Sequence, residues 1–178
     1  MNILLACSVY LPEDVQEMAN WVDVFKVSSF EARDRELTDA VSRHRGDRPF
    51  FSSTGMQEEA DDVTLPKDAI YLHCVSAYPT PLEDAALGAI EPQEGYSDHT
   101  RCIYTGGLAV ASGAHFLEVH YRLDATSPTC PDYPVALSPN QLKQYVMFAR
   151  TAWLARGDGQ KRIMDVEREN LKHRVIVP

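Results

Sequence analysis

Residues 22–29 read Val-Asp-Val-Phe-Lys-Val-Ser-Ser, an apolar run with a lysine near its end and two serines after it. β-Branched and aromatic residues of this kind favour a strand. An unpaired ammonium inside an apolar strand is costly, so Lys26 indicates function more than packing. The stretch therefore predicts a buried strand whose carboxyl end presents polar groups.

Similar short runs recur on both sides of this one, and helical segments separate them. The expected strands are residues 3–7, 22–27, 48–52, 69–75, 95–97 and 115–121. The expected helices are residues 12–21, 32–44, 57–62, 81–90, 100–112 and 139–156. Such strict alternation predicts a parallel sheet with helices outside it.

Polar side chains at the strand ends distinguish two architectures. They are Lys26, Ser29, Ser53, Ser76, Ser97, His99 and His120. An open doubly wound sheet gathers its ligand groups at one switch point, whereas a barrel gathers them from nearly every strand. We therefore predict an incomplete TIM-type (β/α) barrel of about six parallel strands with outer helices.

The chain has 178 residues, which suits one domain of ordinary size. We expect a partial barrel over residues 1–156 and a linker or helical tail over residues 157–178. The tail is polar and charged, with an apolar Val-Ile-Val at 175–177. We expect it to lead towards a further part of the protein.

Composition excludes several classes of protein. A net charge of −9 argues against a broad nucleic-acid-binding surface. The four cysteines are scattered, which argues against a disulfide framework or a structural zinc site. No apolar run reaches the roughly 20 residues of a membrane span, and the N-terminus lacks the features of a signal peptide. We expect a cytoplasmic protein with no membrane or nucleic-acid partner.

Seven short motifs follow one another along the chain. They are Phe-Lys-Val-Ser-Ser (25–29), Ser-Ser-Thr-Gly-Met (52–56), His-Cys-Val-Ser-Ala-Tyr-Pro-Thr-Pro (73–81), Gly-Tyr-Ser-Asp-His-Thr (95–100), Glu-Val-His-Tyr (118–121), Cys-Pro-Asp-Tyr (130–133) and Leu-Ser-Pro (137–139). In this order they closely resemble the N-acetylneuraminate (sialic acid) synthase family, over residues 3–156. The family includes relatives that make legionaminic and pseudaminic acids.

The resemblance implies a fold and an activity. Members of that family fold as eight-stranded (β/α) barrels. They condense phosphoenolpyruvate with an N-acylmannosamine-type sugar and release phosphate. They use a divalent ion, for which we expect Mn²⁺, with Mg²⁺, Fe²⁺ or Zn²⁺ as alternatives.

The resemblance also implies an anion-binding set of small polar and cationic residues. The matching positions are Ser8, Lys26, Ser29, Ser53, Gly55, Ser76 and Ser97. A lysine and several hydroxyls supply hydrogen bonds to a small dianion, and glycine lets the backbone approach a phosphate. Ser76 stands where many members have Asn. Ser52 and Ser53 compete for one inward position, because adjacent strand residues face opposite ways.

His99 and His120 match the metal ligands of the family, and two imidazoles with a carboxylate or water suit such an ion. Glu31, Tyr78 and Asp132 match positions near the sugar. The expected catalytic residues are Lys26, Glu31, His99 and His120.

Structural alternatives remain for several of these residues. His99 follows Asp98 in a turn and could cap it. His120 alternates with Glu118 on a strand, and one of the two could face solvent. His73 fits a packed core histidine, and Cys74 fits a small apolar packing group.

Complete family members carry two more βα units before the segment that matches residue 3. Those units supply a catalytic Glu in a Glu-Ile-Gly-x-Asn-His-type motif and another Lys for phosphoenolpyruvate, and neither motif occurs in these residues. Members that act on free sugars also end in a small antifreeze-protein-like domain. We therefore expect a second copy, a separate chain, or terminal segments such as 175–177 to cover the gap.

Three functions remain open. The first is a phosphoenolpyruvate-dependent synthase of a nine-carbon acidic sugar, completed by self-association or a partner. The second is a non-catalytic or regulatory module that binds a metal and a phosphoenolpyruvate-like ligand, since the general base is absent. The third is a decayed gene product without activity.

Overall fold

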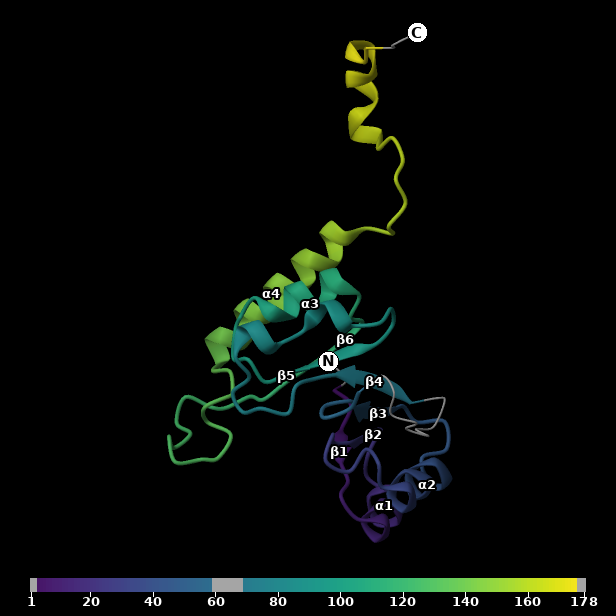
Figure 1. Ribbon diagram of the computed structural model, residues 1–178, viewed down its shortest axis with the longest axis vertical. Coiled ribbons are helices and arrows are strands. Elements are labelled where there is room, and N and C mark those ends of the chain that lie inside the picture. Colours follow the sequence, from purple (N-terminus) through teal and green to yellow (C-terminus); the bar gives the residue numbers. More distant parts are fainter. Residues whose placement is uncertain (1–2, 59–68, 176–178) are drawn as a thin grey trace.

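A computed structural model describes residues 3–58 and 69–175, and its sheet has six strands. The strands are β1 Ala6–Ser8, β2 Val24–Val27, β3 Phe50–Ser53, β4 Ile70–His73, β5 Gly95–Asp98 and β6 Phe116–Val119. Each pairs in parallel with the next, in the order β1-β2-β3-β4-β5-β6. The sheet is an open arc with β1 and β6 at its edges (Figure 1).

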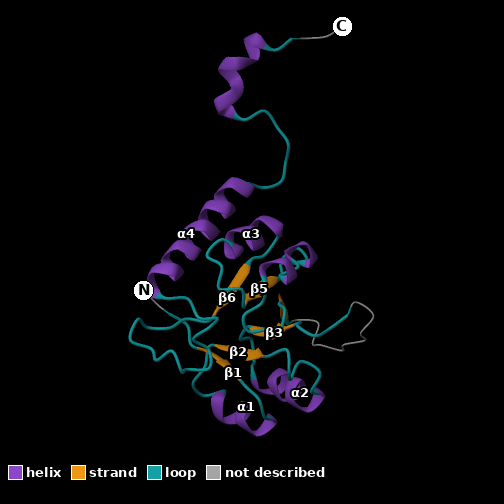
Figure 2. Cartoon of the chain, turned by 60° about the vertical axis from the view of Figure 1, so that its left-hand side comes forward, coloured by secondary structure: helices purple, strands orange, loops and turns teal. Residues whose placement is uncertain are grey.

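Helices flank this arc, as expected for right-handed crossovers between parallel strands. They are α1 Pro12–Met18, α2 Arg35–His44, α3 Thr105–Ser112 and α4 Pro139–Arg156. Figures 1 and 2 show α1 and α2 beside the first strands, and α3 and α4 beside β5 and β6. The structure confirms the predicted incomplete (β/α) barrel of six parallel strands with outer helices.

Local capping fixes where two of the helices begin. Helix α2 starts at Arg35, later than the expected residue 32, because the Asp34 side chain accepts a hydrogen bond from the Leu37 N–H at 3.1 Å. Helix α4 starts as predicted, with a proline in its first turn and a capping box between Ser138 and Gln141.

The helix expected over 12–21 ends at Met18, and two other predicted helices differ more strongly in extent. Residues 81–90 form two short 3₁₀ turns, Leu82–Asp84 and Leu87–Ala89, because Ala86 between them adopts a left-handed φ of 49°. The helix expected over 100–112 begins only at Thr105. The Asp98 carboxylate accepts hydrogen bonds from the Thr100 N–H at 2.8 Å and its hydroxyl at 2.7 Å, and this local turn competes with helix formation.

The described residues form two separate apolar clusters. The larger one fills the space between β1–β3 and the two helices beside them, and its central residues are Val15, Phe25, Val27, Leu37 and Val41. The smaller one joins β5 to α3 and consists of Ile90, Tyr96, Ala109 and Ala114. The sheet is therefore supported by two cores of unequal size.

Beyond α4 the chain extends away from the barrel (Figure 1). Its last element, the 3₁₀ segment η3 Asp165–His173, has no buried residue. The described residues contain no helix with the length and apolar character needed to cross a membrane. The helix expected over 57–62 and the apolar segment 175–177 lie mostly outside the described residues.

Candidate active site

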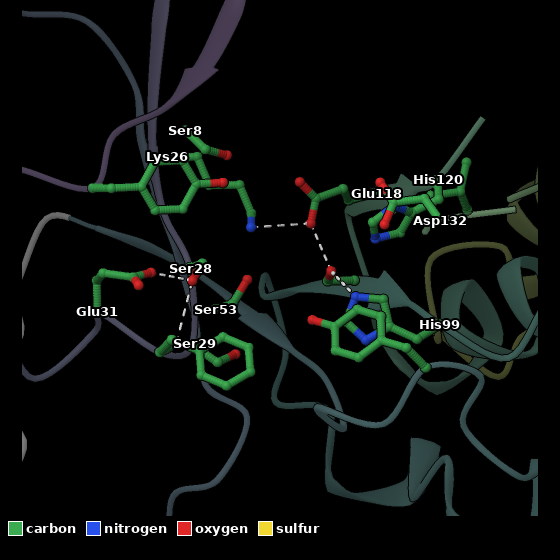
Figure 3. Close-up of a pocket in the computed structure, with 15 residues that line it drawn as sticks. Ser8, Lys26, Ser28, Ser29, Glu31, Ser53, His99, Glu118, His120 and Asp132 are labelled. Atoms are coloured by element: carbon green, nitrogen blue, oxygen red, sulfur yellow. Dashed lines mark hydrogen bonds and ion pairs between the residues drawn. The ribbon is translucent and has the colours of Figure 1, made fainter. Parts of the chain in front are cut away.

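A cavity of about 400 Å³ opens at the carboxyl ends of the strands. Ten of the predicted site residues line it, from β1 to the loop after β6, and most of them are labelled in Figure 3. They are Ser8, Lys26, Ser29, Glu31, Ser53, Tyr78, Ser97, His99, His120 and Asp132. The parallel arrangement explains this gathering, because the carboxyl ends of neighbouring strands meet at one rim.

One end of the cavity carries the lysine and several hydroxyls. Ser8 and Lys26 are register partners on β1 and β2, so they lie at the same level of the sheet. The Lys26 side chain is only 15% exposed. Ser53 is 2% exposed, and its hydroxyl has no hydrogen-bond partner in the described structure. A buried hydroxyl without a partner is costly, so Ser53 is available to bond a ligand.

Of Ser52 and Ser53, only Ser53 lines the cavity. Ser52 is completely buried, on the face that points towards the helices. The alternation of side chains along a strand accounts for this separation. The structure therefore selects Ser53 as the inward residue of the pair.

Gly55 and Ser76, the other two predicted site residues, lie behind the cavity wall. The Gly55 N–H donates to the Ser29 hydroxyl at 3.0 Å. A Cβ at this glycine would overlap the Ser76 hydroxyl and approach Ser29 Oγ to 2.8 Å and Cys74 Sγ to 2.9 Å. The glycine thus permits close packing of these side chains behind the anion end.

Glu118 crosses the cavity and was missed by the sequence analysis as a site residue. Its Oε2 lies 3.4 Å from Lys26 Nζ and accepts a hydrogen bond from Ser97 Oγ at 2.6 Å (Figure 3). Ser97 and Glu118 are register partners on β5 and β6. Glu118 therefore links the lysine end to the imidazole end.

A signal for Glu118 was present in the sequence. It stands two positions before His120, and strand residues at this spacing face the same side. Both side chains line the cavity, so the alternative that one of them faces solvent is wrong. Four further residues that the sequence did not indicate also line the cavity, namely Tyr10, Ser28, Phe30 and Val119.

The imidazole end is built from three aromatic side chains. The ring centroids of His99 and His120 are 5.4 Å apart. Tyr78 packs beside His99, with 4.3 Å between ring centroids, and meets His120 edge-on at 6.0 Å. His99 is only 6% exposed, whereas Tyr78 beside it is 47% exposed, so His99 lies on the buried side of this end.

Each imidazole has an oxygen acceptor near its Nδ1 atom. His99 Nδ1 is 2.8 Å from the Val75 carbonyl, and His120 Nδ1 is 3.4 Å from Asp132 Oδ2. A carbonyl oxygen can only accept, so His99 carries its proton on Nδ1 and its Nε2 keeps a lone pair. An outer partner of this kind orients metal-binding histidines.

Burial shifts two pKa values at this end of the cavity. It lowers the pKa of His99, and this effect outweighs the hydrogen bond to the Val75 carbonyl, which acts in the opposite direction. The neighbouring His120 lowers the same pKa further. Burial also raises the pKa of Tyr78. His99 is thus kept neutral, which is the form that binds a metal.

The donor set limits what a metal could find here. Among the described residues, no group of three or more His, Cys, Asp or Glu side chains is arranged to hold an ion. The two imidazoles fit a divalent ion whose other ligands are oxygens of substrate or water. A divalent ion held by the two imidazoles would therefore need its remaining ligands from outside the described side chains.

The contacts of Glu31, His73 and Cys74 show where these three residues lie relative to the cavity. Glu31 accepts a hydrogen bond from the Ser28 hydroxyl at the lysine end. His73 lies outside the cavity, where its Nε2 is 3.2 Å from the Ala85 carbonyl and its ring stacks on Tyr96. Cys74 is buried behind the wall against Ser29. His73 and Cys74 therefore have the packing roles expected of them.

Comparison with known proteins agrees with the motifs. The pattern of the NeuB family matches residues 1–161. The pseudaminic acid synthase of Campylobacter jejuni (strain 81-176) is 31% identical over 98% of this chain and 54% of the relative. The N,N'-diacetyllegionaminic acid synthase of C. jejuni (strain NCTC 11168) is 32% identical over 83% of this chain and 48% of the relative.

A solved structure shares the fold. The N-acetylneuraminic acid synthetase of Leptospira borgpetersenii, determined with citrate, superposes with a TM-score of 0.74. It is 28% identical and covers 86% of this chain and 57% of that one. The chain spans about half the length of the curated relatives it matches. By its sequence and its half-barrel, the chain belongs to the NeuB family of sialic acid synthases.

Proposed function

We propose that this chain provides the phosphoenolpyruvate- and cation-binding part of a synthase for a sialic-acid-like nine-carbon acid. The observation that carries the proposal is that one cavity is lined by a lysine, several hydroxyls and two histidines. The relatives named for pseudaminic and legionaminic acids support the class of product. The second substrate would be an N-acylated amino sugar.

The two ends of the cavity would bind different groups, an anion at the lysine end and a divalent ion at the imidazole end. Lys26 would pair with the phosphate or carboxylate of phosphoenolpyruvate, and Ser53 would donate its free hydroxyl. His99 and His120 would hold the divalent ion, with Mn²⁺ as the expected one. When bound, the ion would polarise the sugar carbonyl as a Lewis acid.

Residues near the sugar would orient it between the two ends. Asp132 and Tyr78 stand at the imidazole end, and Glu31 stands at the lysine end. Acid and hydroxyl groups placed on opposite sides can hold one sugar in a single pose.

The arc itself motivates a proposal about assembly. In the described structure β1 and β6 each pair on one side only, and Leu4 and Leu5 before β1 are 64% and 55% exposed. Unpaired parallel edges beside apolar side chains are unfavourable. We propose that further strands cover these edges in the active form, supplied by a longer polypeptide, a second copy or a separate chain.

The test is phosphate release from phosphoenolpyruvate by the purified chain, with Mn²⁺ and a panel of N-acylated amino sugars. Sugar-dependent release that is lost in His99→Ala and His120→Ala is the expected result. Full activity in both variants would contradict the assignment of the imidazoles. Binding of phosphoenolpyruvate without release would instead favour the non-catalytic binding module.

A further inference from the structure

The cavity carries more negative than positive charge. Lys26 is the single cationic side chain that lines it in the described part of the chain, and three carboxylates accompany it, on Glu31, Glu118 and Asp132. Three carboxylates against one ammonium leave a net charge of −2 on these four side chains. A site for a dianionic ligand would ordinarily have the opposite sign.

The lysine is also already engaged. Glu118 lies 3.4 Å from its ammonium and is held in place by the Ser97 hydroxyl at 2.6 Å. An entering phosphate must therefore share Lys26 with a carboxylate that is fixed and close. Two anionic groups on one ammonium repel each other, and the repulsion is larger in a partly buried site than in water.

A cation at the imidazole end would reverse this balance. The Ser97 hydroxyl that holds Glu118 is 3.5 Å from His99 Nε2, so Glu118 stands between Lys26 and the position of the ion. Two added positive charges cancel the net −2 of the cavity and offset the repulsion between Glu118 and the ligand. The attraction of Glu118 towards the ion also leaves Lys26 more available.

We propose that a divalent cation bound in this cavity strengthens the binding of the anionic ligand, and that Glu118 is the residue that couples the two. The inference rests on the proposed function for the identity of the two ends. It adds a coupling between the two ligands and names Glu118 as a positioning residue that acts through Lys26. The buried, unpartnered hydroxyl of Ser53 completes the anion end once the charge is balanced.

Linkage gives the proposal a quantitative form. If the cation raises the affinity for the anion by some factor, the anion must raise the affinity for the cation by the same factor. Couplings between two sites in one protein typically amount to roughly 5- to 150-fold. Here the two ligands share one cavity, so we expect at least about a tenfold effect in both directions.

The experiment measures binding alone, on the full chain at constant neutral pH. Calorimetry follows the binding of inorganic phosphate and of phosphoenolpyruvate, with saturating Mn²⁺ and after removal of metal by a chelator. A titration of phosphate into Mn²⁺ without protein corrects for their own association. Equilibrium dialysis measures Mn²⁺ affinity with and without phosphate.

Three variants identify the source of the coupling. Glu118→Gln removes one negative charge and releases Lys26, so phosphate should bind measurably without metal and the coupling factor should fall several-fold. Glu118→Asp keeps the charge and should retain the coupling. Glu169→Gln, an equal change of charge on the exposed tail, should leave every binding constant unchanged.

The outcomes are separable from those of the proposed function. Equal phosphate affinity with and without Mn²⁺ would overturn the inference, and so would a coupling factor unchanged in a folded Glu118→Gln variant. Failure to bind phosphate even with Mn²⁺ would overturn it as well. Coupled binding without any turnover would support the inference while contradicting catalysis by this chain.

Discussion

The two halves of the sheet differ in how completely they bury their apolar surface. On the side of β1–β3, Phe25, Leu37 and Val41 are fully buried between strands and helices. On the side of β6, Tyr145 is the one buried residue within Pro139–Arg156, while Trp153 and Leu154 are 54% and 81% exposed. The first half is stabilised by a core of its own, although Leu4 and Leu5 at its edge are exposed, whereas the long helix of the second half buries a single side chain.

The cavity lies between these two halves of the sheet and is lined by residues of both. Lys26 stands on the self-supporting half, and His99 and His120 stand on the half with the exposed surface. The anion end therefore depends mainly on local packing. The imidazole end depends on elements whose apolar faces are only partly covered in the described structure.

The largest expected effect separates the two ends of the cavity. Replacing both histidines, as His99→Asn with His120→Asn, should weaken Mn²⁺ binding by more than roughly 100-fold, because losing even an outer partner of a ligand costs about 10- to 100-fold. Equilibrium dialysis measures this loss. Lys26→Met is the matched variant for the other end and should retain Mn²⁺ binding. Similar losses in both would show that the ends are not distinct.

A pair of leucines tests the difference in burial. Leu37→Ala removes a fully buried side chain from the larger core and should lower the free energy of unfolding by about 2–5 kcal/mol. Leu154→Ala removes an exposed one and should change it by less than about 0.5 kcal/mol in the isolated chain. Urea denaturation measures both. A large loss in Leu154→Ala would mean that the second half is already covered in solution.

Two glycines test the packing behind the anion end. Gly55→Ala places a methyl group against Ser76, Ser29 and Cys74 and should cost about 1–3 kcal/mol. Gly88→Ala is the control, because a Cβ there meets nothing within 4 Å. Thermal unfolding compares the two variants. Equal melting temperatures would contradict the close packing that the structure shows.

The smallest expected effect is a pH dependence at the imidazole end. Because burial lowers the pKa of His99 below its ordinary value of 6.5, the unfolded chain takes up this proton first as the pH falls. Stability should therefore decrease below about pH 6.5, down to the lower pKa of the folded state. Subtracting the profile of metal-free His99→Gln from that of the metal-free wild type isolates this contribution. A difference independent of pH would contradict the burial of the imidazole.

Most of the fold was predictable because strand and helix patterns repeat in a strict order. Alternation placed all six strands in the correct sequence, and polar strand ends distinguished a barrel from an open sheet. The largest errors in the helix boundaries occurred where a local turn replaced part of an expected helix. Asp98 shortened the expected helix before Thr105, and the left-handed Ala86 divided another. Neither is encoded in a periodic pattern.

The site residues that belong to the short motifs were predictable from the sequence. Contacts that depend on how neighbouring strands are aligned were not. Ten of the predicted site residues line the cavity. Glu118 was considered only because either it or His120 could face solvent. Its role depends on the register of β5 with β6 and on the reach of Lys26 across the cavity, which the sequence alone does not specify. The spacing of two between Glu118 and His120 was the signal that pointed to it.

The most direct test of the central claim is whether the cation and the anion occupy one cavity. Phosphorus NMR of phosphate, recorded with substoichiometric chain and Mn²⁺, reports how close the bound anion lies to the paramagnetic ion. The account predicts strongly enhanced relaxation that requires the protein and disappears in Lys26→Met and in the double histidine variant. Enhancement that persists in Lys26→Met, or that does not exceed the value for Mn²⁺ and phosphate alone, would contradict it.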